Sequence, residues 1–391
     1  MSVRIPISRP YFGEEERLAL TEPLETGWVV QGPRVQAFEQ AFAARIGAAH
    51  AAATTSCTTA LHLAVAALGL APGDEVIVPA FTWISTANVV EHMGARPVFC
   101  DIDLATFNID VRQIEARITS RTVGIIPVHL FGLCADMPAV SRVAAANGLW
   151  VLEDAACGFG AAIDGRHAGT LGTAGCFSFH PRKAITTGEG GMVTTADAEL
   201  DRRVRSLRDH GASRSDLERH VSTRSFLLSD YDLLGYNYRM TDFQGALGVV
   251  QLARGDEILG ARRRIAARYD AALAGAAWLD LPACPDGYTH GYQSYVCLFR
   301  PEAPTLARMP ELHDRRNAIM ARLEARGIAT RQGTHAPPFT GFYAAKYGYR
   351  LEDFPQAALA ERLSLSLPVY TQLTDAEVDE VCSALRDAFD A

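Results

Sequence analysis

The sequence predicts an α/β protein with a large, mainly parallel β-sheet, helices on both faces of that sheet, and a smaller α+β domain. Apolar strand-like runs alternate with helical patterns as far as residue 154, which is the spacing of βαβ units. These runs are apolar throughout, as expected for strands buried on both faces. From about residue 278 the pattern changes. We therefore expect a large domain over residues 1–255, including an N-terminal arm, and a small domain over residues 256–391.

Composition restricts the class of protein. The chain has 391 residues, 48% hydrophobic and 21% charged, so it can bury a large core and form two or more domains. The net charge of −8, without a long run of one sign, argues against nucleic acid or an anionic membrane as the main partner. No signal peptide or membrane-spanning run is evident. Eight scattered cysteines without a CxxC pair indicate reduced thiols in a cytoplasmic protein, with neither disulfides nor a metal site.

The first half of the chain predicts alternating helices and strands after an extended arm at residues 1–12. Gly27 and Gly47 mark the ends of the first two helices. The expected helices cover residues 14–24, 35–46, 60–68, 85–93 and 138–147. The expected strands lie at residues 51–53, 75–79, 97–101, 124–129 and 150–154.

The second half begins with a strand at residues 176–179. Residues 201–231 are rich in charged side chains and predict a mobile or partner-facing loop, with a charged surface segment as the alternative. Arg262, Arg263 and Arg264 form a basic cluster that we expect on a solvated helix face. The remaining helices are expected at residues 242–252, 256–273, 312–326, 355–363 and 375–389. The remaining strands are expected at residues 292–299, 328–331 and 365–368, with a loop at 333–338.

The stretch over residues 176–193 carries the most specific chemistry. Pro181 ends a buried strand because it has no N–H to donate, and three glycines between residues 188 and 191 permit tight turns. Lys183 lies in the turn between two strand-like runs. Burial favours the neutral amine, which can form a Schiff base with a carbonyl group. A solvated loop lysine is the alternative.

A second cluster, residues 54–59 (TTSCTT), follows a strand of small residues and precedes a helix. Hydroxyls and free backbone N–H groups then point to one place, which suits a phosphate. An ordinary helix cap is the alternative. Because ligands bind beyond the carboxyl ends of parallel strands, this cluster, Trp83 and Asp154 can converge on one crevice.

Together these residues fit one cofactor, pyridoxal 5′-phosphate (PLP). PLP needs a lysine for the Schiff base and a carboxylate beside its pyridine nitrogen, and Lys183 and Asp154 supply both. Trp83 can stack on the ring. No GxGxxG follows the first strand, which disfavours a nucleotide-binding oxidoreductase. The groups that can hold the phosphate belong to Cys57, Thr58 and Ser178.

Five motifs cover nearly the whole chain: residues 79–83 (PAFTW), 127–132 (PVHLFG), 153–156 (EDAA), 176–193 and 235–241 (GYNYRMT). Together they resemble the DegT/DnrJ/EryC1/StrS family of PLP-dependent sugar aminotransferases. The resemblance implies fold type I, the aspartate aminotransferase architecture, and a homodimer with active sites at the subunit interface. It also implies transfer of an amino group from L-glutamate to a keto group of a nucleotide-linked (deoxy) sugar. Pyridoxamine 5′-phosphate would form in between, and the products would be an amino-sugar and 2-oxoglutarate.

The resemblance assigns roles to individual residues. Lys183 would bind PLP covalently and act as general base, and Asp154 would face the pyridine nitrogen. Trp83 would take the stacking place. The phosphate contacts would come from Ser178, from Thr58 and, out of the neighbouring subunit, from Asn237.

Two positions depart from the family pattern. Cys57 replaces the usual glycine before the phosphate threonine, where its backbone N–H can still serve. Cys157 replaces a glutamine that faces the cofactor in many members, and a small buried apolar residue is the alternative role for it. The candidates for substrate contact, each with a structural role as the alternative, are His180, His210, Tyr238, Arg239, Arg331 and His335. The two arginines could meet a carboxylate or a diphosphate.

Other functions stay open at this point. A keto-cyclitol of an aminoglycoside-type pathway could replace the sugar, or the chain could be a PLP-binding sensor without turnover. Some family members are dehydratases that carry histidine in the lysine place, and Lys183 argues against that reaction here.

Overall fold

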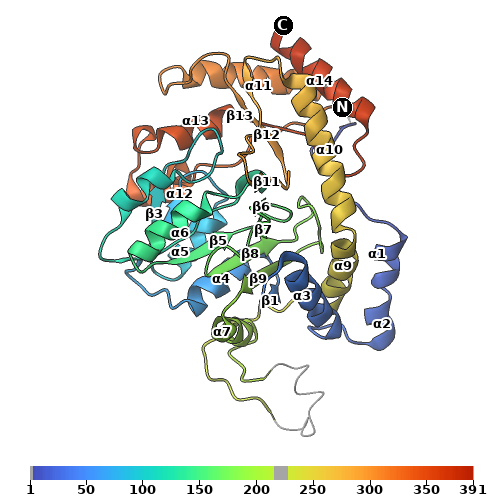
Figure 1. Ribbon diagram of the computed structural model, residues 1–391, viewed down its shortest axis with the longest axis vertical. Coiled ribbons are helices and arrows are strands. Elements are labelled where there is room, and N and C mark those ends of the chain that lie inside the picture. The colour runs from blue at the N-terminus through green and yellow to red at the C-terminus, as the bar shows by residue number, and fades with distance from the viewer. Residues whose placement is uncertain (1–2, 215–227, 391) are drawn as a thin grey trace.

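The computed structural model describes residues 3–214 and 228–390. Its centre is a seven-stranded sheet in the order β1-β9-β8-β5-β4-β2-β3 (Figure 1). All neighbouring pairs are parallel except those of β9, which runs antiparallel to both β8 and β1. The mainly parallel sheet is therefore confirmed. Its strands are β1 (His50–Thr54), β2 (Glu75–Pro79), β3 (Arg96–Cys100), β4 (Thr122–Ile125), β5 (Trp150–Asp154), β8 (Ala174–Ser178) and β9 (Gly191–Thr195).

Helices cover both faces of this sheet, because its strands alternate apolar side chains between two cores. In β2, Val76 and Val78 belong to one core while Ile77 belongs to the other. The first core also takes side chains of α4 (Cys57–Ala67), α5 (Ser85–His92) and α7 (Ala198–Arg208). The second takes side chains of α3 (Pro33–Ile46), α6 (Met137–Ala146) and α9 (Asp242–Ala253).

Two helix predictions need correction near the N-terminus. The single helix expected over residues 14–24 is two short helices, α1 (Glu14–Ala19) and α2 (Glu22–Thr26). Pro23 stands in the first turn of α2, where it lacks the N–H that would continue α1, so a new helix begins there. The helix expected from residue 60 begins earlier, at Cys57, because the Ser56 side chain caps it.

The loop expected over residues 201–231 is wrong for its first part. α7 continues to Arg208, with the Asp197 carboxylate accepting hydrogen bonds from the N–H groups of the first turn. Leu200, Val204 and Leu207 recur at helical spacing and are buried. The rest of the prediction falls partly on residues 215–227, which lie outside the described residues.

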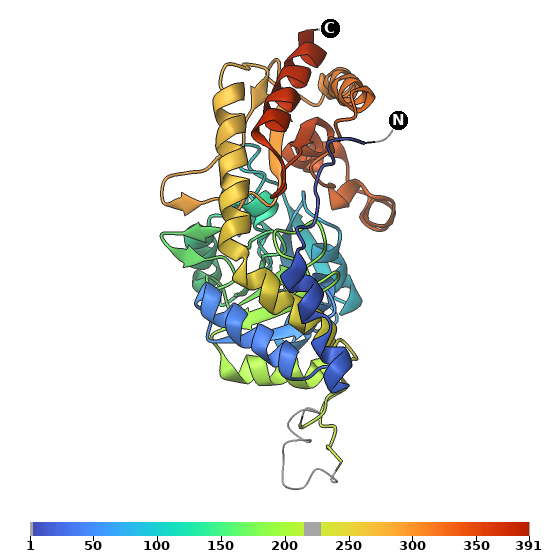
Figure 2. The ribbon, with the colours of Figure 1, turned by 90° about the vertical axis from the view of Figure 1, so that its right-hand side faces the viewer.

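The C-terminal part packs four helices on a small sheet of β10 (Leu279–Asp280), β12 (Tyr295–Phe299) and β13 (Ser364–Leu367). The helices are α10 (Gly255–Leu273), α11 (Met309–Ala325), α13 (Pro355–Leu363) and α14 (Asp375–Asp390). Instead of the strand expected at residues 328–331 there are two isolated bridges, Ile5 to Ile328 and Arg331 to Ser366. The N-terminal arm therefore runs along the C-terminal part (Figure 2). A domain boundary at residue 255 falls at the start of α10 and stays a prediction.

Several short elements complete the fold. A second three-stranded sheet lies beside the large one. Its strands are β6 (Ala162–Ile163), β7 (Arg166–His167) and β11 (Tyr288–Thr289). The remaining helices are α12 (Gly341–Tyr347), η1 (Val111–Gln113), η2 (Glu115–Arg117), η3 (Leu130–Gly132), η4 (Pro337–Phe339) and η5 (Leu351–Asp353). Among the helices of the described residues, none is long and apolar enough to cross a membrane.

The arginine cluster of α10 is a solvated face at Arg263 and Arg264, which are exposed, but not at Arg262. Arg262 is buried, and its guanidinium donates to the backbone oxygens of Tyr292 and Gln293. Arg263 donates to the backbone oxygens of His290 and Gly160. Burial lowers the pKa of Arg262 to about 10. The two arginines therefore hold the chain before β12 in place, which sequence periodicity could not show.

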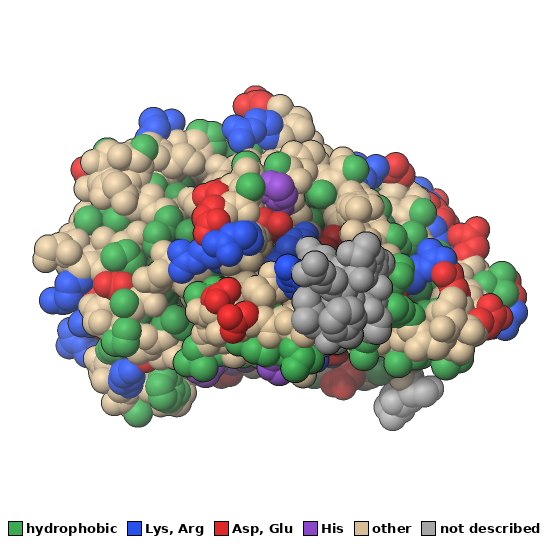
Figure 3. Space-filling model, turned by 90° about the horizontal axis from the view of Figure 1, so that it is seen from below, with side chains coloured by type: hydrophobic (Ala, Val, Ile, Leu, Met, Phe, Trp, Pro, Cys, Tyr) green, Lys and Arg blue, Asp and Glu red, His purple; other side chains and the backbone are tan. Residues whose placement is uncertain are grey.

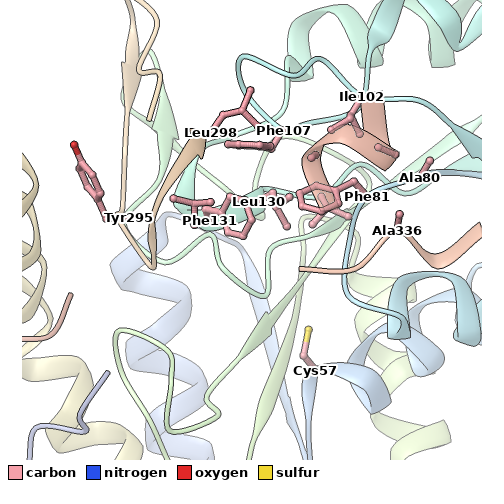
Figure 4. Close-up of a cluster of buried hydrophobic side chains, with 14 of the residues drawn as sticks. Cys57, Ala80, Phe81, Ile102, Phe107, Leu130, Phe131, Tyr295, Leu298 and Ala336 are labelled. Atoms are coloured by element: carbon pink, nitrogen blue, oxygen red, sulfur yellow. The ribbon is translucent and has the colours of Figure 1, made fainter. Parts of the chain in front are cut away.

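Aromatic side chains join the C-terminal part to the large sheet. Phe81, Phe107 and Phe131 pack against one another with ring centroids 5.5–6.2 Å apart. Leu298 and Ala336 belong to the same buried cluster (Figure 4). This cluster lies directly beyond the end of β2, so it fixes the loops that surround the strand ends described next.

Candidate active site

Adjacent strand ends bring the predicted cofactor residues together. β5 ends on Asp154, which pairs in register with Cys176 of β8. Two residues later β8 ends at Ser178, and Lys183 follows in the turn, where its N–H donates to the backbone oxygen of His180 over 2.8 Å. Asp154 and Lys183 therefore lie close together because β5 and β8 are neighbours in the sheet.

Asp154 is buried and held by two donors. The Thr86 hydroxyl donates to Asp154 Oδ2 over 2.7 Å, and the N–H of Ala156 donates to Oδ1 over 3.1 Å. Burial raises the pKa of Asp154, and these donors together with Lys183 oppose that rise. Thr82 Oγ1 lies 3.0 Å from Thr86 Oγ1, so a chain of two hydroxyls fixes the carboxylate from the start of α5.

Thr82 and Thr86 are site residues that sequence reasoning missed. The signal for them is their spacing of four residues around the first turn of α5, which puts both side chains on the helix face that meets β5. Trp83 lies between them in the chain. Its indole is 58% exposed and lies 5.8 Å from the His335 ring, measured between centroids.

Lys183 contacts a thiol. Its Nζ lies 3.1 Å from Cys157 Sγ. Burial by itself lowers the pKa of Lys183, but the Cys157 thiol and the Asp154 carboxylate outweigh it, so the pKa is raised on balance. Burial favours the neutral amine, as expected, but the neighbours of the amine favour its charged form more strongly.

The N-terminus of α4 forms a cradle for an anion. Ser56 Oγ accepts from the N–H of Thr59, and no partner is found for the N–H groups of Cys57 and Thr58 in residues 3–214 and 228–390. The Thr58 hydroxyl donates to Ser85 Oγ over 2.9 Å, and the Cys57 thiol faces the Cys176 backbone oxygen. Two unpaired N–H groups and a hydroxyl at a helix N-terminus suit a phosphate.

Gly191 brings Ser178 to this cradle. It pairs with Thr54 of β1 on one side and with Ser178 of β8 on the other. A Cβ at Gly191 would lie 2.3 Å from the backbone oxygen of Ser56, so only glycine permits this approach. Ser178 therefore lies near the start of α4, although Thr58 and Ser178 are 120 residues apart in sequence.

The predicted segment 235–241 lies beside the cradle of the same chain. The Tyr238 backbone oxygen accepts from the N–H of Thr55 over 3.1 Å, and its ring stacks on Tyr236. Asn237 is exposed. Arg239 is already neutralised by Asp209, with 2.5 Å between Nη1 and Oδ1.

The remaining candidates for substrate contact are spread around this region. The His180 ring accepts from the N–H of Arg182 over 3.2 Å, so it helps to hold the lysine turn. His210 has a positive φ of 59° and its N–H donates to Tyr236. Arg331 is exposed, and the His335 backbone oxygen accepts from Thr82.

Behind Asp154, a buried pair fixes the loops around the site. The N–H of Ala135 donates to His129 Nδ1, so Nε2 carries the proton and donates to Glu153 over 2.7 Å. The Glu153 carboxylate also accepts from three backbone N–H groups of residues 169–172. Glu153 is therefore a structural residue, whereas Asp154 beside it is free to face a ligand.

These residues fit PLP. Asp154 supplies a buried carboxylate. Lys183 supplies an amine that contacts Cys157, three residues after Asp154 in the chain. The α4 cradle can accept a phosphate. The exposed Trp83 indole offers a face for an aromatic ring. Among the described residues no group of three or more metal-ligating side chains is found.

A large cavity lies away from these residues. It measures about 640 Å³ and lies between α3 and α7, with Arg202, Arg203 and Arg205 in its lining. Lys and Arg side chains interleave with Asp and Glu over the end of the molecule where α7 lies (Figure 3). Neither Lys183 nor Asp154 lines this cavity.

Comparisons with known proteins agree with the family resemblance of the five motifs. The model of the DegT/DnrJ/EryC1/StrS aminotransferase family matches residues 10–386. The chain is 41% identical to the spore coat polysaccharide biosynthesis protein SpsC of Bacillus subtilis, over 98% of this chain and 96% of that protein. It resembles the putative sugar aminotransferase Spr1654 from Streptococcus pneumoniae in its PMP-form, with 28% identity, a TM-score of 0.91 and 99% of each chain covered. Helicobacter pylori PseC, an aminotransferase involved in the biosynthesis of pseudoaminic acid, gives 25% identity and a TM-score of 0.90 over 99% of each chain.

Proposed function

Because the chain belongs to the DegT/DnrJ/EryC1/StrS aminotransferase family, it is a PLP-dependent sugar aminotransferase of fold type I, and we propose that it aminates a nucleotide-linked keto-sugar with L-glutamate as donor. The observation that carries this proposal is the convergence of Lys183, Asp154 and the α4 cradle at three strand ends. PLP, when bound, supplies an electron sink for the carbon that carries the transferred nitrogen.

Each residue has a separate task in this proposal. Lys183 would bind the aldehyde carbon of the cofactor and, once displaced, would move a proton through Nζ. Asp154 would keep the pyridine nitrogen protonated, held in place by Thr86. Because Cys157 Sγ lies against Nζ, the thiol would orient the amine in place of the glutamine that many relatives carry. The phosphate would lie against Thr58, Ser178 and the free N–H groups of α4.

We also propose a homodimer in which Asn237 reaches the phosphate of the neighbouring subunit. Large apolar side chains are exposed in two nearby stretches of the chain: Leu24 is 69% exposed, Val30 53%, Leu228 86% and Leu234 94%. Exposed apolar side chains in such number favour an interface. Asn237 is exposed close to residues 228–234, so a partner subunit could receive it.

The test is a turnover assay with the purified enzyme, PLP and L-glutamate against a panel of nucleotide-linked keto-sugars. The proposal predicts 2-oxoglutarate and an aminated nucleotide sugar in equal amounts, both absent with Lys183→Ala. A keto-cyclitol panel tests the alternative acceptor. Amination of keto-cyclitols alone would refute the nucleotide-sugar assignment. Binding of PLP without turnover of any acceptor would favour a sensor.

A further inference from the structure

Arg182, the residue before Lys183, and Arg331 are each fixed at the backbone by hydrogen bonds. The N–H of Arg182 donates to His180 Nδ1, and its backbone oxygen accepts from Gln293 Nε2 over 3.2 Å. Arg331 exchanges two backbone hydrogen bonds with Ser366. In the part of the chain that the structure describes, neither guanidinium forms an ion pair with a carboxylate. Arg239, by contrast, is paired with Asp209.

The loops that carry these arginines meet at Phe131. The Phe131 backbone oxygen accepts from the N–H of Ser294. Ser294 follows Gln293, whose side chain donates to the backbone oxygen of Arg182. On the other loop, a Cβ added at Gly333 would lie 2.9 Å from the Phe131 ring. Phe131 therefore sets the spacing between the Arg182 and Arg331 loops.

The two charges act on each other. The surrounding protein and the charge of Arg331 both lower the pKa of Arg182, although both side chains are open to solvent. Like charges that are held together without a carboxylate raise the free energy of the unliganded protein. An anion placed between them removes this cost and gains charge-assisted hydrogen bonds from two planar forks.

We propose that Arg182 and Arg331 form an oxyanion subsite of the active site. Arg182 directly precedes Lys183, so an anion bound there belongs to a molecule whose reacting atom lies at the amine. The proposed function, on which this inference rests, supplies two substrates with such an anionic group. L-Glutamate carries carboxylates, and the nucleotide sugar carries a diphosphate. Both substrates would bind in turn at the same place, where Lys183 would move the proton, so both can use the same arginines.

The test measures binding rather than turnover. Glutarate, a dicarboxylate without an amino group, and inorganic pyrophosphate are titrated into the PLP-loaded enzyme by calorimetry. The variants are Arg182→Gln and Arg331→Gln, and the matched control is Arg142→Gln, an exposed arginine on α6. The visible PLP band shows that each variant is folded and loaded.

We expect each variant to raise the dissociation constant of both probes by about tenfold, the contribution of a charge-assisted hydrogen bond, with no change for the control. Weakening of glutarate alone would assign the subsite to the donor, and weakening of pyrophosphate alone to the acceptor. Unchanged affinities in both variants, or an equal loss in the control, would overturn the inference. A wild-type enzyme that binds the probes but does not react with L-glutamate would contradict the proposed function and leave the subsite standing.

Discussion

Replacing Thr86 with valine tests how the fold holds the cofactor carboxylate. Valine keeps the shape of threonine but removes the hydroxyl that donates to Asp154 Oδ2 over 2.7 Å. Thr86 is fully buried, so water cannot replace the lost donor. A hydrogen bond to a charged group contributes about 1.5–3 kcal/mol. At about 1.4 kcal/mol per tenfold, its loss corresponds to a weakening of cofactor binding by roughly 10- to 100-fold.

The assay for Thr86→Val is titration of the apoenzyme with pyridoxamine 5′-phosphate, which cannot bond covalently to Lys183. Loss of the Thr86 donor also raises the pKa of Asp154 beyond the rise that burial causes. The carboxylate then loses its charge at a higher pH, so the deficit in binding should grow as the pH falls. Thr86→Ser keeps the hydroxyl and should restore most of the affinity. Equal affinity of the valine variant and the wild type across pH would refute the reasoning.

Three further predictions concern the cradle, the lysine and acid stability. Gly191→Ala places a methyl group 2.3 Å from the Ser56 backbone oxygen, so it should weaken the binding of pyridoxamine 5′-phosphate at least tenfold. The control is Gly260→Ala, whose methyl group meets nothing within 4 Å and should leave the binding unchanged. Cys157→Ala removes a neighbour that raises the pKa of Lys183, so the rate of PLP attachment, followed by absorbance, should reach its plateau at lower pH; an unchanged profile would contradict this. Burial lowers the pKa of His290 to about 3, so the unfolded chain binds a proton that the folded chain does not, and stability falls from pH 6.5 towards pH 3. A His290→Asn variant should show a flatter fall of Tm over that range, and an identical slope would count against it.

The sheet, and the positions of Asp154 and Lys183 after its strands, were predictable because their signals are local. Asp154 follows an apolar strand, and Lys183 lies in a glycine-rich turn after another. They become neighbours because β5 pairs in parallel with β8, although the described chain between these strands forms β6 and β7 and no helix. The free N–H groups at Cys57 and Thr58 were also predictable, since a strand of small residues leads straight into a helix.

What the sequence could not show depends on contacts between distant segments. Thr86 donates to a carboxylate 68 residues away, and nothing in its own helix distinguishes it from an ordinary first-turn threonine. Arg262 belongs to a run of three arginines that is typical of a solvated face, yet two backbone oxygens before β12 draw it inside. Burial of Lys183 was predictable, but the thiol and carboxylate that reverse its effect on the amine come from another strand end.

The most direct test of the central claim is the absorbance spectrum of the purified enzyme before and after addition of L-glutamate. We expect a yellow band from PLP bound to Lys183 that bleaches when the amino group is taken up, and no such band in Lys183→Ala. A protein that takes up no PLP when it is supplied, or a band that persists in Lys183→Ala, would contradict the assignment of this site.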